Sequence, residues 1–337
     1  MILNTGYFIN IRRDMVKYYD SIKCRKDPEE RANGTCSNFT LVERTAARKN
    51  WPTMKPCPAY PQNLSGRIEV LPQVVVPISA VDVTSPDGIR VGGWWEPRDC
   101  ISRHSVAIII PYMDRWRHLT TLLNYLHPFL KRQRIRHKIY VVEQYGNETF
   151  NKGSIMNAGF IEAMKDEIYH CFIFHDVDLI PENDQNMYSC PQMPRHLSVA
   201  VNELKYMLPY PELVGGVLAI RPEHYFKVNG YSNFFWGWGG EDDDMAYRLS
   251  QSGLFITRPI SDIGRYTMIK HKKRKPSNSA VRRKLLATSK KRYRLEGLNS
   301  VQYKLMKKKE LPWFTLIQVD VGKPHPSFHV YKTPGTR

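Results

Sequence analysis

The sequence lacks a long apolar run near its start and any Cys-x-x-Cys pair, and it holds few acidic residues for its many basic ones. The opening stretch, MILNTGYFINIRRDMVKYYD, contains no segment long enough for the core of a signal peptide or for a membrane span. With 337 residues, 42% of them hydrophobic, the chain can still bury a sizeable core. Disorder throughout is therefore excluded, and one large α/β domain with an extension, or two modest domains, fits the length.

The cysteine pattern favours disulfides over a structural zinc site. There are six cysteines, and none has the Cys or His spacing that a zinc site uses. Four Asn-x-Ser/Thr sequons accompany them and together indicate an oxidising, lumenal compartment. The cysteines are Cys24, Cys36, Cys57, Cys100, Cys171 and Cys190, and the sequons begin at Asn33, Asn38, Asn63 and Asn147.

The net charge of +18 predicts attraction to anions, which include nucleic acid, an acidic membrane and a phosphorylated small substrate. The strongest basic run is KHKKRK at 270–275, in a segment from 270 to 284 that we expect to form a basic loop. No recognised nucleic-acid-binding module accompanies this run. We therefore expect no nucleic-acid partner.

Apolar runs alternate with amphipathic segments from residue 106 onward. VAIII at 106–110 predicts a strand, and leucines from Leu119 to Leu130 share one face of the helix that follows. The repeated order predicts a βαβαβ unit in a mostly parallel sheet, which binds ligands at the carboxyl ends of its strands. The other predicted strands are 138–144, 171–178, 197–201 and 215–220, and the other predicted helices are 152–167 and 241–253.

Asp176 and Asp178 lie in FHDVDLIP (174–181), where an apolar strand ends. Because one residue separates them at a strand end, one carboxylate can turn toward a cation. The other can then bond a sugar hydroxyl or the chain's own turn. Mg²⁺ and Mn²⁺ accept oxygen ligands and bridge phosphates. An isolated Asp-x-Asp pair more often caps a turn, because Asp hydrogen-bonds its own backbone. The pair alone leaves both interpretations open.

The segment WGWGGEDDD (236–244) suits a packed strand poorly, because its glycines cost entropy and its acids repel one another. Trp236 and Trp238 offer flat faces on which a sugar ring can stack, and Glu241 and Asp242 offer a carboxylate to deprotonate a sugar hydroxyl. The same acids would complement the dipole of a helix that begins there. A base at a helix N-terminus satisfies both interpretations.

Met268 and His271, in TMIKH, are the third feature. On its own each residue more often packs in a core or lies on the surface than binds a metal ion.

Six motifs occur in the order FNKGSIMNAGF, FHDVDLIP, LPYPELVGGV, NGYSNFFWGWGGEDDD, MIKH and EGLNSVQY. With them the sequence resembles the β-1,4-galactosyltransferases, glycosyltransferase family seven, over about residues 57–323. The resemblance implies a single α/β catalytic domain of the GT-A type at 57–323, which binds a UDP-sugar and Mn²⁺ and inverts the anomeric carbon by direct displacement. Residues 1–56 would form a stem and 324–337 a C-terminal tail.

The resemblance also implies roles for individual residues. Asp242 would be the general base on the acceptor 4-hydroxyl, and Glu241 with Asp176 would hold the donor sugar. Asp178, Met268 and His271 would bind the metal. Further donor contacts would come from Pro111, Arg115, Phe150, Lys152, Val177, Leu213 and Trp238, and acceptor contacts from Tyr210, Gly216, Trp238 and Asp243. The implied disulfides are Cys57–Cys100 and Cys171–Cys190, which leaves Cys24 and Cys36 for a third bridge.

Several positions depart from the family pattern. Met113 and Lys152 replace arginines, and Lys152 supplies a cation that is not bidentate. Val281 and Arg282 stand near the family's acceptor-contacting Arg-Phe pair. At Leu213 galactose-specific members carry Tyr or Phe, whereas members with Ile or Leu accept UDP-GalNAc. We therefore expect UDP-GalNAc as the donor and UDP-Gal as the alternative.

The xylose-directed branch of the family reads WGWGREDDE with an HIHD-like metal segment, and this chain has neither. The expected acceptor is therefore terminal β-GlcNAc on glycoproteins or glycolipids. By the same resemblance we expect a type II Golgi membrane protein whose N-terminal anchor is missing from this chain. A second copy of the chain, in a homodimer, is a further expected partner. A non-catalytic, lectin-like protein is the rival interpretation, against which the joint presence of the catalytic and metal-binding residues argues.

Overall fold

The structure is a computed structural model that describes residues 54–71, 88–271 and 277–324. From Lys55 onward these residues belong to one compact unit. Most of the predicted stem, most of the predicted tail, Cys24, Cys36, Asn33 and Asn38 lie outside the described residues. Within the described part, no helix is both long enough and apolar enough to span a bilayer.

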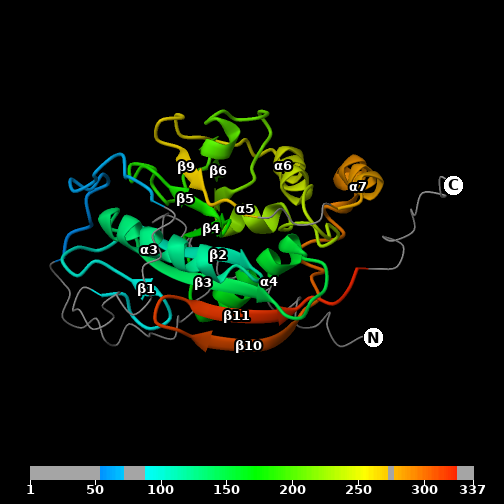
Figure 1. Cartoon of the computed structure of the whole chain (residues 1–337), viewed down its shortest axis with the longest axis horizontal. Helices are drawn as coiled ribbons and strands as arrows, with labels where there is room; N and C mark the ends of the chain where they lie inside the picture. The colour runs from blue at the N-terminus through cyan, green and yellow to red at the C-terminus, as the bar shows by residue number, and fades with distance from the viewer. Residues whose placement is uncertain (1–53, 72–87, 272–276, 325–337) are drawn as a thin grey trace, which may run out of the picture. The chain divides into compact units, whose positions relative to one another are not determined.

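An eight-stranded mixed sheet forms the centre of this unit, with β10 and β11 at its lower edge in Figure 1. The strand order is β10-β11-β3-β2-β4-β8-β6, and β1 also pairs with β3. The strands are β1 (Trp94–Trp95), β2 (Ser105–Tyr112), β3 (Arg136–Gln144), β4 (Cys171–His175), β6 (Arg195–His196), β8 (Val217–Ile220), β10 (Lys304–Glu310) and β11 (Thr315–Asp320).

The prediction of a mostly parallel sheet was wrong, because only β11, β3, β2 and β4 run parallel to one another. The outer pairs β10–β11, β4–β8 and β8–β6, together with β1–β3, are antiparallel. The parallel centre is nonetheless the most buried part, and every residue of β2 is buried. A parallel strand covered on both faces favours a continuous apolar run, which is what VAIII supplies.

A second, three-stranded sheet contains β5 (Leu179–Pro181), β9 (Arg265–Met268) and β7 (Ala200–Val201), in that order. The strand expected at 197–201 is confirmed only at its end. The chain leaves the large sheet after β6 and joins the small sheet at β7, so the residues between them belong to neither.

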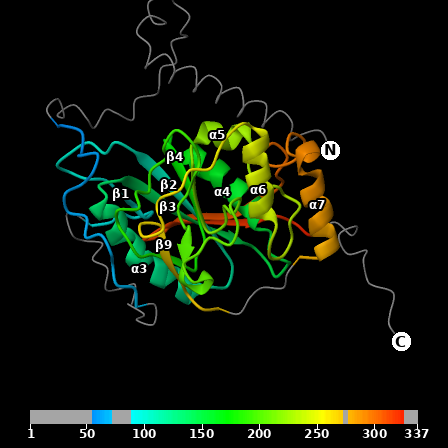
Figure 2. The ribbon, with the colours of Figure 1, turned by 90° about the horizontal axis from the view of Figure 1, so that it is seen from above.

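Five helices of the described part pack around the sheets (Figures 1 and 2). In α3 the predicted leucine face is buried in the core cluster. Helix α4 begins where the Asn151 side chain accepts a hydrogen bond from the Ser154 backbone N–H at 2.9 Å. The helices are α3 (Trp116–Arg132), α4 (Lys152–Asp166), α5 (Pro222–Lys227), α6 (Glu241–Gln251) and α7 (Ser279–Arg292).

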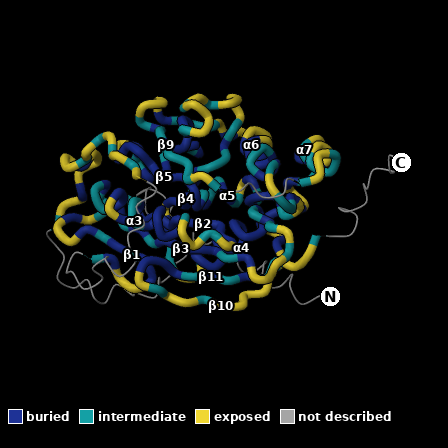
Figure 3. Tube along the Cα trace, viewed as in Figure 1, coloured by how far each residue is buried: buried dark blue, intermediate teal, exposed yellow. Residues whose placement is uncertain are grey.

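The expectation of a basic loop over 270–284 was wrong for its last six residues, which open α7. Asn278 caps this helix, because its side-chain oxygen accepts hydrogen bonds from the backbone N–H groups of Ala280 and Val281. Residues 272–276 lie outside the described part. Figure 3 shows the buried strands at the centre of the unit and the exposed edge strand β10.

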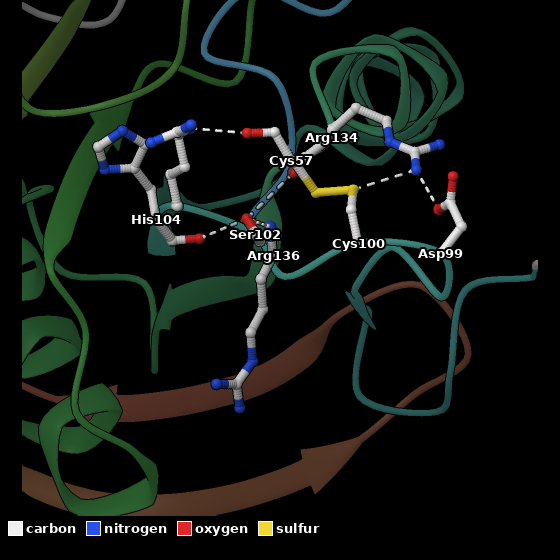
Figure 4. Close-up of a disulfide and its surroundings, with 8 residues drawn as sticks. Cys57, Asp99, Cys100, Ser102, His104, Arg134 and Arg136 are labelled. Carbon is white, nitrogen blue, oxygen red and sulfur yellow. Dashed lines mark hydrogen bonds and ion pairs between the residues drawn. A yellow bond between two sulfur atoms is a disulfide. The ribbon is translucent and has the colours of Figure 1, made fainter. Parts of the chain in front are cut away.

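Both disulfides implied by the resemblance, Cys57–Cys100 and Cys171–Cys190, are present. Around the first, Arg103 Nε donates to the Cys57 carbonyl at 2.6 Å, and the Arg134 guanidinium donates to Cys100 Sγ at 3.2 Å (Figure 4). Ser102 Oγ donates to the carbonyls of His104 and Arg134. These contacts fix the first described segment to the connections that lead into β2 and β3.

Candidate active site

A small pocket opens where β4 ends and α6 begins. Asp176 follows β4 directly, and Asp242 lies in the first turn of α6. The pocket is lined by Lys152, Met156, Phe174, Asp176, Val214, Gly215, Gly216, Leu218, Tyr231 and Asp242. The structure therefore brings together the two acidic segments that the sequence analysis singled out separately.

Lys152, the first residue of α4, links the carboxylates on the two sides of the pocket. Its Nζ lies 2.7 Å from Asp176 Oδ1 and 3.3 Å from Glu241 Oε1. Burial alone would lower the pKa of Lys152, but the carboxylates of Asp176, Glu241 and Asp242 raise it well above its usual value. A lysine at this position is therefore a fixed cation between residues expected to hold the donor.

Asp242, the predicted general base, has a raised pKa. Burial, and then the charge of Glu241, raise its pKa from 3.8 to about 7, against the opposing charge of Lys152. A base with a pKa near the working pH combines a populated carboxylate with a useful affinity for the proton. The backbone N–H of Asp243 donates to Asp242 Oδ1 at 3.0 Å and orients the carboxylate.

Gly215 allows the Asp242 carboxylate to approach the chain. A Cβ atom at residue 215 would lie 2.3 Å from Asp242 Oδ2, closer than real Cβ contacts reach. The same added atom would lie 3.5 Å from Leu213 Cδ1. Leu213, the residue expected to choose the donor sugar, therefore lies beside Asp242, the predicted base.

The three predicted metal ligands converge beside this pocket. Residue Asp178 immediately precedes β5, and Leu179 pairs with Met268 across the β5–β9 ladder. His271 Nδ1 lies 3.1 Å from Asp178 Oδ2, and Arg115 Nη1 lies 2.9 Å from the same oxygen. Arg115, expected to contact the donor, therefore pairs with the predicted ligand.

The chemistry of this donor set fits a divalent cation. Burial, and then the charge of Asp176, raise the pKa of Asp178, while His271 and Arg115 lower it. A buried carboxylate of this kind is stabilised by a nearby positive ion. Within the described residues no group of three His, Cys, Asp or Glu side chains is placed to hold a metal ion. The predicted set contains two such residues, Asp178 and His271, and its third member is Met268.

The residues expected on the acceptor side surround the first turn of α6. The Tyr210 hydroxyl donates to Asp243 Oδ1 at 2.7 Å, and Gly216 follows Gly215 with a φ of +92°. Trp238 is 59% exposed, and its carbonyl accepts a hydrogen bond from the Ser277 N–H at 3.1 Å. Its indole is therefore available to a sugar ring.

Of the remaining predicted residues, Pro111 and Val177 are buried, and the Phe150 carbonyl accepts from the Gly237 N–H at 2.8 Å. That bond ties the start of α4 to the loop that carries Trp238. The sequon residues Asn63 and Asn147 are exposed, as glycan attachment requires.

Two buried histidines beneath the pocket were not predicted from the sequence. His196 Nε2 lies 2.8 Å from the Gly215 carbonyl oxygen, and His175 Nδ1 lies 2.8 Å from the Asp176 carbonyl oxygen. Burial lowers the pKa of each to about 4, so both are neutral donors near pH 7. The only signal for them was a polar residue within or next to a buried strand.

A buried quartet of charges, also missed, fixes α6 to α7. Arg248 pairs with Asp244 and with Glu296, each at 2.6 Å, and Arg292 pairs with the same two carboxylates. Asp244 and Arg248 are fully buried, and Arg248 Nη1 also donates to the backbone carbonyls of Asn229, Gly230 and Glu296. This network lies directly behind the turn that presents Glu241 and Asp242.

Two family models match the chain. One, the N-terminal region of glycosyl transferase group 7, covers residues 57–191, and the other, described as the N-terminal domain of galactosyltransferase, covers residues 195–272. β-1,4-Galactosyltransferase 2 of Cricetulus griseus is 41% identical over 298 residues, which cover 87% of this chain and 80% of that protein. β-1,4-Galactosyltransferase 1 of Mus musculus is 42% identical over 271 residues, which cover 80% of this chain and 67% of that protein.

Solved structures agree with these relatives. The catalytic domain of Drosophila β-1,4-galactosyltransferase 7, in complex with xylobiose, superimposes with a TM-score of 0.58 at 32% identity, covering 65% of this chain and 94% of that one. A mutant of the same protein, in complex with manganese, UDP-Gal and xylobiose, gives a TM-score of 0.56. The chain therefore belongs to the β-1,4-galactosyltransferase family, glycosyltransferase group 7, and is a UDP-sugar-dependent enzyme with the GT-A fold.

Proposed function

We propose that this enzyme transfers galactose from UDP-Gal, with inversion, to the 4-hydroxyl of a terminal β-GlcNAc on glycoproteins or glycolipids in the Golgi lumen. The observation that carries the proposal is the Asp242 carboxylate, whose pKa is raised to about 7 and which shares one pocket with Lys152 and Asp176. The named relatives, all β-1,4-galactosyltransferases, support the galactose donor.

The proposed reaction needs a base on one side of the anomeric carbon and charge compensation on the other. Asp242 takes the proton of the acceptor 4-hydroxyl while that oxygen forms the bond to the anomeric carbon. The bond from this carbon to the β-phosphate oxygen breaks, and UDP leaves with the electron pair. Asp178, Met268 and His271 would hold Mn²⁺, which neutralises diphosphate charge when bound.

The donor-side residues of the chain act through position and charge. Lys152 pairs with both Asp176 and Glu241 and holds their carboxylates in place, so that both can accept hydrogen bonds from donor-sugar hydroxyls. Trp238, in a glycine-rich loop whose glycines adopt positive φ, offers an apolar face to the sugars. Closure of that loop would exclude water, which otherwise competes with the acceptor.

UDP-GalNAc is the second candidate donor, and Leu213 favours it. Leu213 lies beside Gly215 and Asp242, where a tyrosine ring would crowd a 2-acetamido group. A leucine leaves more room at this place. The family resemblance at Leu213 favours this donor, whereas the names of the relatives favour UDP-Gal.

A donor panel with the purified enzyme, Mn²⁺ and a β-GlcNAc acceptor tests both candidates through the release of UDP. If the proposed function is right, UDP is released from UDP-Gal, and its release depends on the acceptor. If GalNAc is transferred faster than Gal, the donor is UDP-GalNAc instead. Leu213→Tyr should lower the GalNAc to Gal ratio by at least about tenfold, the order expected for steric exclusion of a small group. Xylobiose serves as the competing acceptor, and absence of transfer from every donor would favour the lectin-like rival.

A further inference from the structure

The chain makes a tight turn at Tyr210–Leu213, just before the segment that lines the pocket. The Leu213 backbone N–H donates to the Tyr210 carbonyl at 3.3 Å, and Pro211 has the second position, where its fixed φ suits a turn. The Tyr210 hydroxyl reaches Asp243, on the expected acceptor side. Leu213, the residue expected to choose the donor sugar, is followed by three residues of the pocket lining. The turn therefore connects the two sides of the site.

Arg258, which lies between α6 and β9, holds this turn through its backbone. Arg258 Nη2 donates to the Leu213 carbonyl at 3.0 Å and also to the Pro211 carbonyl. Arg258 is not among the described residues that line the pocket, so it acts on the turn from outside. Since a guanidinium is planar and its N–H groups have fixed directions, it restricts the turn more than a flexible lysine ammonium would.

The backbone next to Arg258 is fixed to β6, the edge strand of the large sheet. The Thr257 N–H donates to the Pro194 carbonyl at 2.8 Å, and the His196 N–H donates to the Thr257 carbonyl at 3.0 Å. Burial lowers the pKa of Arg258, and its Nε is buried without a hydrogen-bond partner in the described part of the chain. A fully solvated arginine avoids this loss of hydration. The bonds from Nη2 to the turn offset it.

Gly215 is held without Arg258. His196 Nε2 lies 2.8 Å from the Gly215 carbonyl oxygen, and because a carbonyl only accepts, this nitrogen carries the proton and donates. Ser198 Oγ donates to the same carbonyl at 3.2 Å. The Asp242 carboxylate beside Gly215 thus keeps its neighbour when Arg258 is changed. Loss of Arg258 should therefore free the turn and leave the predicted base in place.

We propose that Arg258 is a positioning residue for donor specificity, which holds Leu213 beside the donor sugar. The inference rests on the proposed function, because it assumes that the pocket takes a UDP-sugar. A Cβ at Gly215 would lie 3.5 Å from Leu213 Cδ1 and 2.3 Å from Asp242 Oδ2, so the leucine side chain lies close to the proposed base. A side chain excludes a sugar substituent only if its backbone cannot yield, and the bonds from Arg258 oppose that movement.

The test asks whether the effect of Leu213→Tyr depends on Arg258. Leu213→Tyr is made in the native enzyme, in Arg258→Met and in the control Arg221→Met. Arg221 is a matched control, because its Nε also donates to a backbone carbonyl, that of Pro191, at 2.8 Å, and it lies outside the pocket lining of the described chain. The measured quantity is the ratio of kcat/KM for UDP-GalNAc to that for UDP-Gal, with Mn²⁺ and a β-GlcNAc acceptor. Loss of folded enzyme lowers both values equally and cancels in this ratio.

We expect Leu213→Tyr to lower the ratio at least about tenfold in the native and Arg221→Met backgrounds, as steric exclusion of a small group predicts. In Arg258→Met the freed turn lets the tyrosine ring move away from the acetamido group, so the same substitution should lower the ratio by less than about threefold. An equally large effect in Arg258→Met would overturn the proposal, as would no effect in the native enzyme. If Arg258→Met does not fold, Arg258→Gln, whose side chain is too short to reach both carbonyls, replaces it.

A binding experiment separates this proposal from the proposed function. If none of the proteins transfers either sugar to β-GlcNAc, the proposed function fails, and the dissociation constants of UDP-GalNAc and UDP-Gal are measured by calorimetry with Mn²⁺ and without acceptor. Leu213→Tyr should then change the ratio of the two constants about tenfold in the native enzyme and less than about threefold in Arg258→Met. Equal changes in the two backgrounds, including no change in either, would contradict the role of Arg258.

Discussion

Replacing Gly215 with alanine should displace the carboxylate of Asp242, the proposed base, while leaving the fold in place. The new Cβ would lie 2.3 Å from Asp242 Oδ2, whereas real Cβ contacts stay beyond 3.0 Å, so the carboxylate must move by about 0.7 Å or more. Residue 215 has no positive φ, and alanine therefore fits its backbone. Misplacement of a reacting group by about 1 Å can reduce the rate about 100-fold, or about 2.7 kcal/mol in transition-state stabilisation.

The assay is steady-state sugar transfer at saturating donor and acceptor, paired with thermal unfolding of the same samples. We expect kcat to fall about 100-fold with a melting temperature within a few degrees of the native protein. Gly253→Ala is the control, because its φ of +67° adds backbone strain while no atom lies within 4 Å of the new Cβ. Activity of the Gly215 variant within about twofold of the native enzyme would refute the reasoning, as would a loss of activity that follows unfolding.

Three further predictions concern protonation and stability. Because burial and Glu241 raise the pKa of Asp242 to about 7, kcat/KM should fall with pH below about 7 as the base becomes protonated; a flat profile from about pH 5.5 to about pH 8 would contradict this. Arg248→Met should lower the free energy of unfolding by about 3 kcal/mol in urea titrations, since Asp244 and Glu296 lose a buried partner, and a loss below about 1 kcal/mol would show that Arg292 suffices. Replacing Cys171 and Cys190 with alanine, at a sequence separation of 19, should cost about 3 kcal/mol in the same titration, and an unchanged midpoint would contradict it.

Much of the fold could be predicted because its strongest patterns are local. VAIII, the leucine face of α3 and the run of acids at 241–244 each identify their element, and β2, α3 and α6 occur where expected. The antiparallel strands were harder, because the lysine-rich β10 is an exposed edge strand without an apolar signal. Basic composition likewise obscured α7, although Asn278 was a readable helix cap.

The residues of the candidate site likewise fall into those with a local sequence pattern and those without one. Asp176, Asp178, Glu241 and Asp242 form dense acidic clusters that attract notice in a sequence, and the structure brings all four close together. The residues that position these carboxylates give no such signal in the sequence. Arg248 and Glu296 are far apart along the chain, and their contact depends on how α6 and α7 pack, so no local pattern could reveal it.

The central claim is that Asp242 is the base that activates the acceptor 4-hydroxyl. Its most direct test compares the native enzyme with Asp242→Asn in the rate of Gal transfer from UDP-Gal to a β-GlcNAc acceptor in the presence of Mn²⁺. Equal melting temperatures of the two proteins show that the variant is folded. The account predicts a β-1,4-linked product from the native enzyme and a loss of about 100- to 10,000-fold in kcat for the variant, the range that general bases contribute. Transfer by Asp242→Asn within about threefold of the native rate would contradict it.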